Sequence, residues 1–146
     1  MRDSSRRDII APPLYALRNG LIVNSADTAS GKLTTHVLDT SRGCPGAGLR
    51  IQLHRLHDGQ KTLLKETTTN SDGRCDGPLL QGDKFESGNY ELLFFAGDYF
   101  RGKGGDLKEP LFIDNVVIQF GIANANEHYH VPLLVSPFSY STYRGS

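Results

Sequence analysis

The chain has 146 residues, a length that fits one domain with one hydrophobic core. Its 16 Lys and Arg residues balance 16 Asp and Glu residues, which excludes the strongly basic footprint of a nucleic-acid-binding domain. No apolar run reaches the roughly 20 residues that a membrane-spanning helix needs, so no membrane span is predicted. Sixteen glycines and seven prolines indicate frequent turns, which are typical of an all-β chain.

The first 31 residues differ in character from the rest of the chain. Pro12 and Pro13 interrupt the stretch IIAPPLYAL, and Arg18 follows it closely, so this segment matches a secretory signal poorly. We therefore expect residues 1–31 to form a flexible extension and residues 32–146 to form the folded domain. Without a clear signal peptide the expected compartment is the cytoplasm, and a peroxisomal or periplasmic location stays open.

Strand-like segments follow one another along the domain. In the second of them Leu49, Ile51 and Leu53 fall on one face and polar residues on the other, which is the alternation of a half-buried strand. The continuous apolar content of residues 111–122 predicts a long strand buried on both faces. Residues 97–110 are expected to form a loop with a short helical turn at its start. The predicted strands are 34–39, 49–56, 61–69, 89–96, 111–122, 128–135 and 140 to the C-terminus.

This pattern of short strands with turn signals every ~8–12 residues predicts a β-sandwich with little helix. A sandwich does not identify a function by itself, so the polar residues within the strands carry the functional information. His36 lies on the same side of its strand as Thr34 and Leu38. His128 and His130 flank Tyr129, which places both imidazoles on one face of a late strand.

The remaining polar candidates have simple alternatives. His54 and His57 are interpreted as solvated surface residues near an Asp-Gly hairpin. Arg74 follows a tight Asp-Gly turn and would serve function only if its guanidinium pointed into a pocket, where it could hold an anionic or carbonyl oxygen. The pair His128 and His130 raises the possibility of zinc, but no third ligand with suitable spacing is evident, so no metal site is predicted.

The chain contains two cysteines. Cys44 and Cys75 are too few for a disulfide scaffold and are predicted to be free thiols.

The C-terminus, from Tyr143 through Arg144 and Gly145 to Ser146, continues a strand pattern and carries two hydroxyls and a guanidinium. Chain ends are often frayed, whereas this one continues the pattern of a strand and carries polar side chains. This difference indicates a functional role for the last four residues.

Three segments of the chain resemble those of a known family. The segments HVLDTSRGCPGAGLRIQLHRL, NSDGRCDGPLL and HYHVPLLVSPFSYSTYRGS are similar to the opening, the central turn and the C-terminal signature of transthyretin-like proteins. The resemblance covers roughly residues 32–146. The closing YRGS is its most specific element, because within the family it separates the 5-hydroxyisourate hydrolases from the transthyretins that carry thyroid hormone.

The resemblance implies an all-β, transthyretin-like sandwich of two four-stranded sheets with one short helix after the fifth strand. It also implies a homotetramer, a dimer of dimers with the active sites in a channel between the dimers. By resemblance the catalytic residues are His36, Arg74, His130 and Ser146. Substrate binding is assigned, again by resemblance, to His36, Arg74, Tyr143, Arg144, Gly145 and Ser146.

The implied reaction is the hydrolysis of 5-hydroxyisourate, the product of urate oxidation, to 2-oxo-4-hydroxy-4-carboxy-5-ureidoimidazoline in the purine catabolism pathway that leads to allantoin. No cofactor is implied. His36 and His130 are expected to orient and deprotonate water, without a decision on which of them takes the proton, and Arg74 to stabilise the developing charge. The alternative is a transthyretin-type carrier that binds an aromatic small ligand in the tetramer channel. Its pocket would need an apolar lining.

Overall fold

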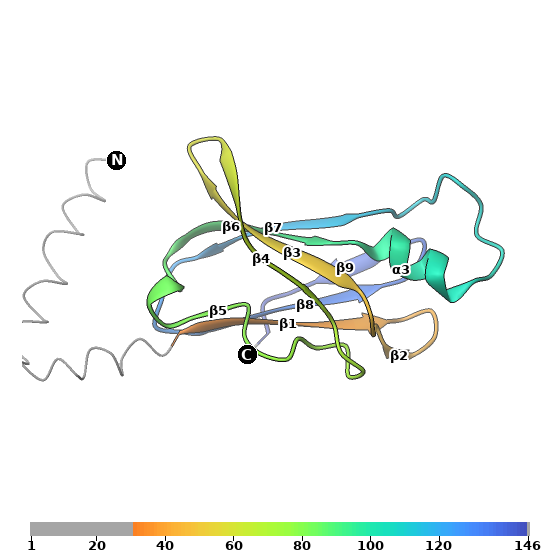
Figure 1. Cartoon of the computed structure of the whole chain (residues 1–146), viewed down its shortest axis with the longest axis horizontal. Helices are drawn as coiled ribbons and strands as arrows, with labels where there is room; N and C mark the ends of the chain where they lie inside the picture. Colours follow the sequence, from red (N-terminus) through yellow and green to blue (C-terminus); the bar gives the residue numbers. More distant parts are fainter. Residues whose placement is uncertain (1–30, 146) are drawn as a thin grey trace, which may run out of the picture.

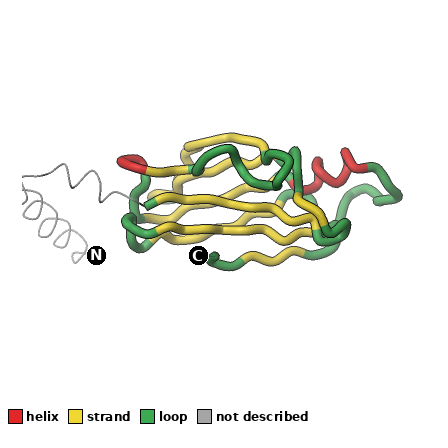
Figure 2. The backbone as a smooth tube through the Cα atoms, turned by 90° about the horizontal axis from the view of Figure 1, so that it is seen from below, coloured by secondary structure: helices red, strands yellow, loops and turns green. Residues whose placement is uncertain are grey.

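The computed structural model describes residues 31–145 of the chain. These residues form two β-sheets stacked face to face, with β-strands running along the long axis of the molecule (Figure 1). The 3₁₀-helix η1, Gly82–Lys84, and the helix α3, Ala96–Lys103, lie at opposite ends of the sandwich (Figure 2). The prediction of an all-β sandwich with one short α-helix is confirmed for this part of the chain.

The first sheet has the strand order β2-β1-β8-β9, with the short β5 also paired to β1. The second sheet has the order β4-β3-β6-β7. The predicted pair of four-stranded sheets is therefore present, and the two-residue β5 is an addition that its short length hides in the sequence. The bounds are β1 Lys32–Asp39, β2 Cys44–Pro45, β3 Arg50–His57, β4 Gln60–Thr68, β5 Leu80–Gln81, β6 Gly88–Phe94, β7 Val116–Ile122, β8 His128–Val135 and β9 Tyr140–Thr142.

The core lies between the sheets and follows the alternation of each strand. Leu49, Ile51 and Leu53 are all fully buried, as the pattern predicted. Tyr90 and Phe94 of β6 pack against the same core from the neighbouring strand. The other buried apolar residues are Leu33, Val37, Leu79, Leu80, Phe85, Leu92, Ala96, Tyr99, Phe100, Val116, Ile118, Ile122, Tyr129, Val131, Leu133 and Val135.

The long strand predicted over residues 111–122 is wrong in its first five residues and in its burial. Only β7, Val116–Ile122, is a strand, and its residues alternate between buried and exposed instead of being buried on both faces. Residues 111–115 form a loop that crosses an end of the sandwich. The apolar run has a different cause: Phe112 is exposed and Ile113 packs against the core from a loop.

The helix α3, Ala96–Lys103, follows the strand β6 directly and includes most of the helical turn that the sequence indicated. It is fixed to the first sheet by a hydrogen bond from the hydroxyl of Tyr99 to Oδ2 of Asp39 at 2.8 Å. Asp39 closes the end of β1 and also accepts hydrogen bonds from the backbone N–H groups of Ser41 and Arg42, at 3.0 and 3.1 Å. Among residues 31–145, no helix has the length and apolar character to cross a membrane.

Candidate functional site

The strands β1 and β8 lie side by side and parallel at the centre of the first sheet, with Thr34 opposite His130 and His36 opposite Pro132. Along β1 the core-facing residues are buried, whereas Lys32, Thr34 and His36 are half-buried on the outer face. His128 and His130 flank the buried Tyr129 and share that outer face. The predicted grouping of His36 and His130 on one surface follows from this register.

A tight turn brings Arg74 to the same face. The backbone N–H of Val37 donates to the carbonyl of Gly73 at 2.8 Å, and His36 and Arg74 form an isolated antiparallel bridge. Gly73 has φ of +76°, and a Cβ there would collide with the carbonyl oxygen of Val37, so only glycine allows this approach. Asn70 shapes the turn by accepting a hydrogen bond from the N–H of Arg74 at 3.1 Å through Oδ1.

Arg74 and His130 line one hollow on this surface, whose volume of about 430 Å³ lies in the range of small-molecule sites. His36 lies next to it, through its bridge to Arg74, but is not among its lining residues. The charged groups of the lining are Lys32 and Arg74, and no carboxylate of the described residues is among them. The remaining lining residues are Thr34, Thr35, Cys75, Gly77, Pro78 and His128.

The electrostatics of this hollow favour neutral imidazoles. Burial and the charge of Arg74 lower the pKa of His36 below its usual value. Burial, Arg74, His128 and His36 together lower the pKa of His130. Both rings are therefore predominantly uncharged at neutral pH and have a lone pair available to accept a proton. Burial raises the pKa of Cys75, so this thiol stays protonated and is a poor nucleophile.

A single hydroxyl connects the two late histidines. Oγ1 of Thr34 lies 2.8 Å from Nε2 of His128 and 2.8 Å from Nδ1 of His130. Thr34 was not among the residues predicted to be functional. The signal that could have found it is its place on the same face of the strand as His36. Within residues 31–145, no group of three or more potential ligands could hold a metal ion.

The end of the chain returns to the same strand. The N–H of Gly145 donates to the carbonyl of His130 at 2.7 Å, which brings Gly145 beside this histidine. The guanidinium of Arg144 instead lies 4.0 Å from the centre of the Tyr129 ring and donates to Glu127 at 2.9 Å. Tyr143 and Arg144 line a second, apolar hollow between β7 and β9. Their predicted role in substrate binding stays a prediction, and Ser146 lies outside the described residues.

The two surface histidines differ from each other. His57 is exposed and lies 3.2 Å from the carboxylate of Asp58, as expected for a solvated residue near the hairpin. His54 is half-buried, and its Nδ1 is buried with no hydrogen-bond partner among the described residues, so the interpretation of His54 as a solvated surface residue is wrong. Its position opposite the buried Glu91 on the second sheet explains the difference. Neither residue lines the hollow that contains Arg74 and His130.

The fold and this surface define a small transthyretin-like sandwich that carries a polar, histidine- and arginine-lined site on its first sheet. Residues 33–145 match the model of the HIUase/Transthyretin family, and the chain belongs to this family. The expected resemblance is thereby confirmed.

Individual relatives agree with this assignment. The chain is 60% identical over 116 residues to a 5-hydroxyisourate hydrolase of Pseudomonas aeruginosa, with 80% of this chain and 92% of the relative covered. The crystal structure of an (S)-allantoin synthase is 52% identical with a TM-score of 0.76, and 80% of this chain spans 44% of that longer chain. Sea bream transthyretin in complex with thyroxine is 25% identical with a TM-score of 0.70, with 78% of this chain and 94% of that chain covered.

Proposed function

We propose that this protein is an enzyme that hydrolyses 5-hydroxyisourate to 2-oxo-4-hydroxy-4-carboxy-5-ureidoimidazoline, a step of urate degradation. The observation that carries the proposal is the joint position of His130 and Arg74 in one hollow, with His36 bridged to Arg74 beside them. The names of the similar proteins support the same substrate, since the relative from Pseudomonas aeruginosa is a 5-hydroxyisourate hydrolase.

The chemistry needs a base for water, and the neutral imidazoles provide it. One of His36 and His130 accepts a proton from water, and the resulting hydroxide adds to a ring carbonyl of the substrate. The lowered pKa values of both histidines keep this base unprotonated near neutral pH. General base catalysis by a positioned side chain contributes roughly 10²–10⁴-fold in rate.

The guanidinium of Arg74 stabilises the oxyanion that forms on the attacked carbonyl, because its fixed fork of donors suits an anionic oxygen. When the C–N bond breaks, the leaving nitrogen takes the proton back from the imidazolium. Water is the second reactant, so the scheme needs neither a metal nor an organic cofactor. The lining charges, Lys32 and Arg74, also suit a substrate rich in carbonyl oxygens.

The C-terminal tetrapeptide completes the proposed site. We assign to Ser146 and Tyr143 hydrogen bonds to substrate or water, and to Arg144 and Gly145 the support of this end of the chain. The hydrogen bond from Gly145 to His130 favours this assignment, because it holds Gly145 beside a residue that lines the hollow.

A carrier of an aromatic ligand is the alternative that the family offers. A carrier site is expected to be predominantly apolar, with a few orienting polar groups. The hollow on the first sheet is instead lined by two cations and two histidines. This polarity favours the hydrolase.

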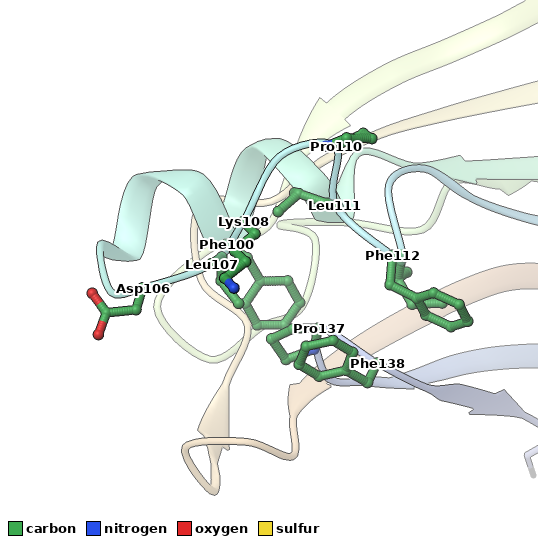
Figure 3. Close-up of a pocket in the computed structure, with 10 residues that line it drawn as sticks. Phe100, Asp106, Leu107, Lys108, Pro110, Leu111, Phe112, Pro137 and Phe138 are labelled. Carbon is green, nitrogen blue, oxygen red and sulfur yellow. The ribbon is translucent and has the colours of Figure 1, made fainter.

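An apolar surface at one end of the sandwich favours self-association. Figure 3 shows Phe112 from the loop after α3 beside Phe138 from the turn between β8 and β9. Their rings stack with centroids 6.3 Å apart, yet they are 74% and 67% exposed. Large apolar groups that remain exposed in one subunit commonly mark an interface. With Phe100, Leu107 and Leu111 they line an apolar hollow.

The sheets also end in strands with free edges. Among the described residues, β7 and β9 each pair on one side alone, and both border the second hollow. Unpaired strand edges favour pairing with another chain. We propose that the protein forms a homotetramer, a dimer of dimers. Size-exclusion chromatography with light scattering measures the mass, and a fully active monomer would contradict the proposal.

The activity is tested directly. Urate oxidase generates 5-hydroxyisourate from urate, the purified protein is added, and the decay of the ultraviolet absorbance of 5-hydroxyisourate is followed. The protein is expected to accelerate this decay well beyond its spontaneous rate. A decay rate that does not change with protein concentration would remove the proposed function.

A further inference from the structure

The hydroxyl of Thr34 lies between two ring nitrogens, one of His128 and one of His130. Because the hydroxyl has a single proton, it restricts the tautomers that these two imidazoles can adopt. Oγ1 lies 2.8 Å from Nε2 of His128 and from Nδ1 of His130. A hydroxyl has one proton to donate and two lone pairs that accept. Because one O–H serves one nitrogen, at least one of the two histidines must donate an N–H to Thr34.

The proposed base role decides which histidine donates. Nδ1 is the nitrogen of the His130 ring that lies 2.8 Å from the hydroxyl of Thr34, so Nε2 is the nitrogen left for water. A neutral imidazole carries one N–H and one lone pair. For Nε2 to accept a proton from water, the proton of the ring must therefore be on Nδ1, the nitrogen that faces Thr34.

The direction of the chain of hydrogen bonds follows. Nδ1–H of His130 donates to Thr34, and the hydroxyl of Thr34 donates in turn to Nε2 of His128. The second nitrogen of His130, Nε2, is then left with a free lone pair. Proton acceptance from water requires such a lone pair, and the opposite tautomer of His130 would offer an N–H instead.

We propose that Thr34 is a positioning residue that fixes His130 in its Nδ1–H tautomer, with His128 as the outer anchor, and thereby makes Nε2 of His130 the atom that accepts the proton of water. This inference rests on the proposed hydrolase function and extends it, because it chooses between the two candidate bases. Thr34 itself touches neither water nor substrate in this scheme.

The location of Thr34 argues against a purely structural role. It lies half-buried on the outer face of β1, away from the core. Its neighbour Thr35 is buried and uses its hydroxyl on the backbone carbonyl of Val131 at 2.7 Å, which is an ordinary structural contact. The hydroxyl of Thr34 instead contacts two side chains of the hollow.

The first experiment measures tautomers directly. Long-range ¹H–¹⁵N correlation spectra of the imidazole rings of the full-length protein are recorded at a pH where both histidines are neutral. In the wild type we expect His130 as the Nδ1–H form and an unprotonated Nε2 on His128. In Thr34→Val, which has the same shape without the hydroxyl, His130 is expected to shift towards the Nε2–H form. A wild-type His130 in the Nε2–H form would overturn the proposal.

The second experiment is kinetic and uses conservative rescue. Thr34→Val is expected to lower kcat roughly 10- to 100-fold, as expected for a misoriented reacting group, with little change in KM. Thr34→Ser keeps the hydroxyl and should restore most of the activity and the wild-type tautomer. The matched control is Thr40→Val, which removes a hydroxyl bonded to the carbonyl of Val135 and should be close to wild type.

The outcomes separate this inference from the proposed function. A wild-type protein that does not accelerate 5-hydroxyisourate decay contradicts the function, and the spectra then still test the direction of the hydrogen bonds. An active wild type together with an unimpaired kcat in Thr34→Val contradicts the positioning role and leaves the function standing. If Thr34→Val fails to fold, the wild-type spectrum and the activity of Thr34→Ser test the proposal instead. A wild-type His130 in the Nε2–H form overturns it. A Thr34→Ser variant that does not have most of the wild-type activity overturns it as well.

Discussion

The backbone of Gly145 lies directly against the imidazole of His130. A Cβ at position 145 would be 2.7 Å from Cδ2 of this ring and 3.3 Å from its Cβ and Cγ. The N–H of Gly145 also donates to the carbonyl of His130 at 2.7 Å. Two features of His130, its backbone and its ring, are therefore held by one glycine near the end of the chain.

Gly145→Ala is expected to lower kcat by about 10-fold or more, because the added methyl group displaces the ring of the proposed base. The residue is near the chain end, so the melting temperature should change little. Steady-state kinetics and thermal unfolding measure the two effects. Gly102→Ala in α3 is the control, since its Cβ meets open space, and a similar loss of activity in both variants would contradict this account.

Alanine at the site residues is expected to remove most of the activity. His36→Ala, Arg74→Ala and His130→Ala should each lose roughly 100-fold or more in kcat/KM, as for removal of a general base or of an oxyanion donor. All three side chains lie on the outer face of the first sheet, so circular dichroism should show folded proteins. His57→Ala is the surface control. Near-normal turnover of any of the three would exclude that residue from the site.

The histidine environment predicts the acid side of the pH profile. The base works as the neutral imidazole, and burial together with Arg74 lowers the pKa of both His36 and His130. Activity is therefore retained as the pH falls to about 6.5, the ordinary histidine value, and is lost below it. Arg74→Gln removes one cause of the lowering, so its acid limb should move to higher pH in addition to the loss of rate.

The profile of kcat/KM against pH checks this, because it reports the pKa values of the free enzyme. Arg50→Gln is the matched control, since Arg50 lies on the second sheet, paired with Glu66. An acid limb that stays in place in Arg74→Gln would show that Arg74 does not set the pKa of the base.

Much of the first sheet could be predicted from the sequence, and the contacts between its distant parts could not. Period-two alternation places His36 and Thr34 on one face, and His128 and His130 on one face, because strand geometry is local. The approach of Arg74 to His36 depends on a turn that docks onto β1 far along the chain. The sequence shows the turn residues and not the docking.

The errors have physical causes of the same kind. Phe112 and Ile113 were included in the predicted strand because the sequence pattern does not distinguish an apolar residue in a loop from an apolar residue in a buried strand. His54 was expected to be solvated because it lies on the polar face of β3. Its neighbour across the sheet, Glu91, is buried there by Lys61 and Gln119, which both hydrogen-bond it at 3.0 Å. Such cross-strand burial depends on the register of four strands, β4, β3, β6 and β7.

Asp39 is expected to stabilise the fold in a pH-dependent way. Burial by itself raises the pKa of this carboxyl, but hydrogen bonds from Ser41, Tyr99 and Arg42 outweigh it and lower the pKa below its usual value. For a depressed pKa the stabilisation is present above the unfolded value, near 3.9, and is lost as the pH falls through the folded value. Asp39→Asn should therefore cost roughly 1–3 kcal/mol at neutral pH.

Urea unfolding of wild type and Asp39→Asn across a pH series measures this difference. The gap in the free energy of unfolding should be widest near neutral pH and should narrow below pH ~4. Asp58→Asn is the control, since this carboxylate in the β3–β4 turn is exposed. A gap that does not depend on pH would show that the charge of Asp39 has no part in its effect.

Removal of residues 143–146 is expected to abolish activity while the domain stays folded. The deletion eliminates the hydrogen bond from Gly145 to His130 and the ion pair of Arg144 with Glu127, whose groups are about half exposed. Exposed ion pairs contribute little, so a loss of about 1–2 kcal/mol, or a decrease of several degrees in the melting temperature, is expected. The strand β9, Tyr140–Thr142, is retained and keeps its pairing with β8.

A tag fused after Ser146 tests the same end of the chain without removing any residue. Gly145 lies beside His130, so added residues continue from a point next to the hollow and should hinder the substrate. The same tag at the N-terminus is the control and should leave turnover unchanged. Activity is followed by the absorbance decay of 5-hydroxyisourate, and folding by thermal unfolding of each variant. If the truncated protein turned over substrate as fast as the complete one, the C-terminal tetrapeptide would have no place in the site, and the contact of Gly145 with His130 would serve the fold alone.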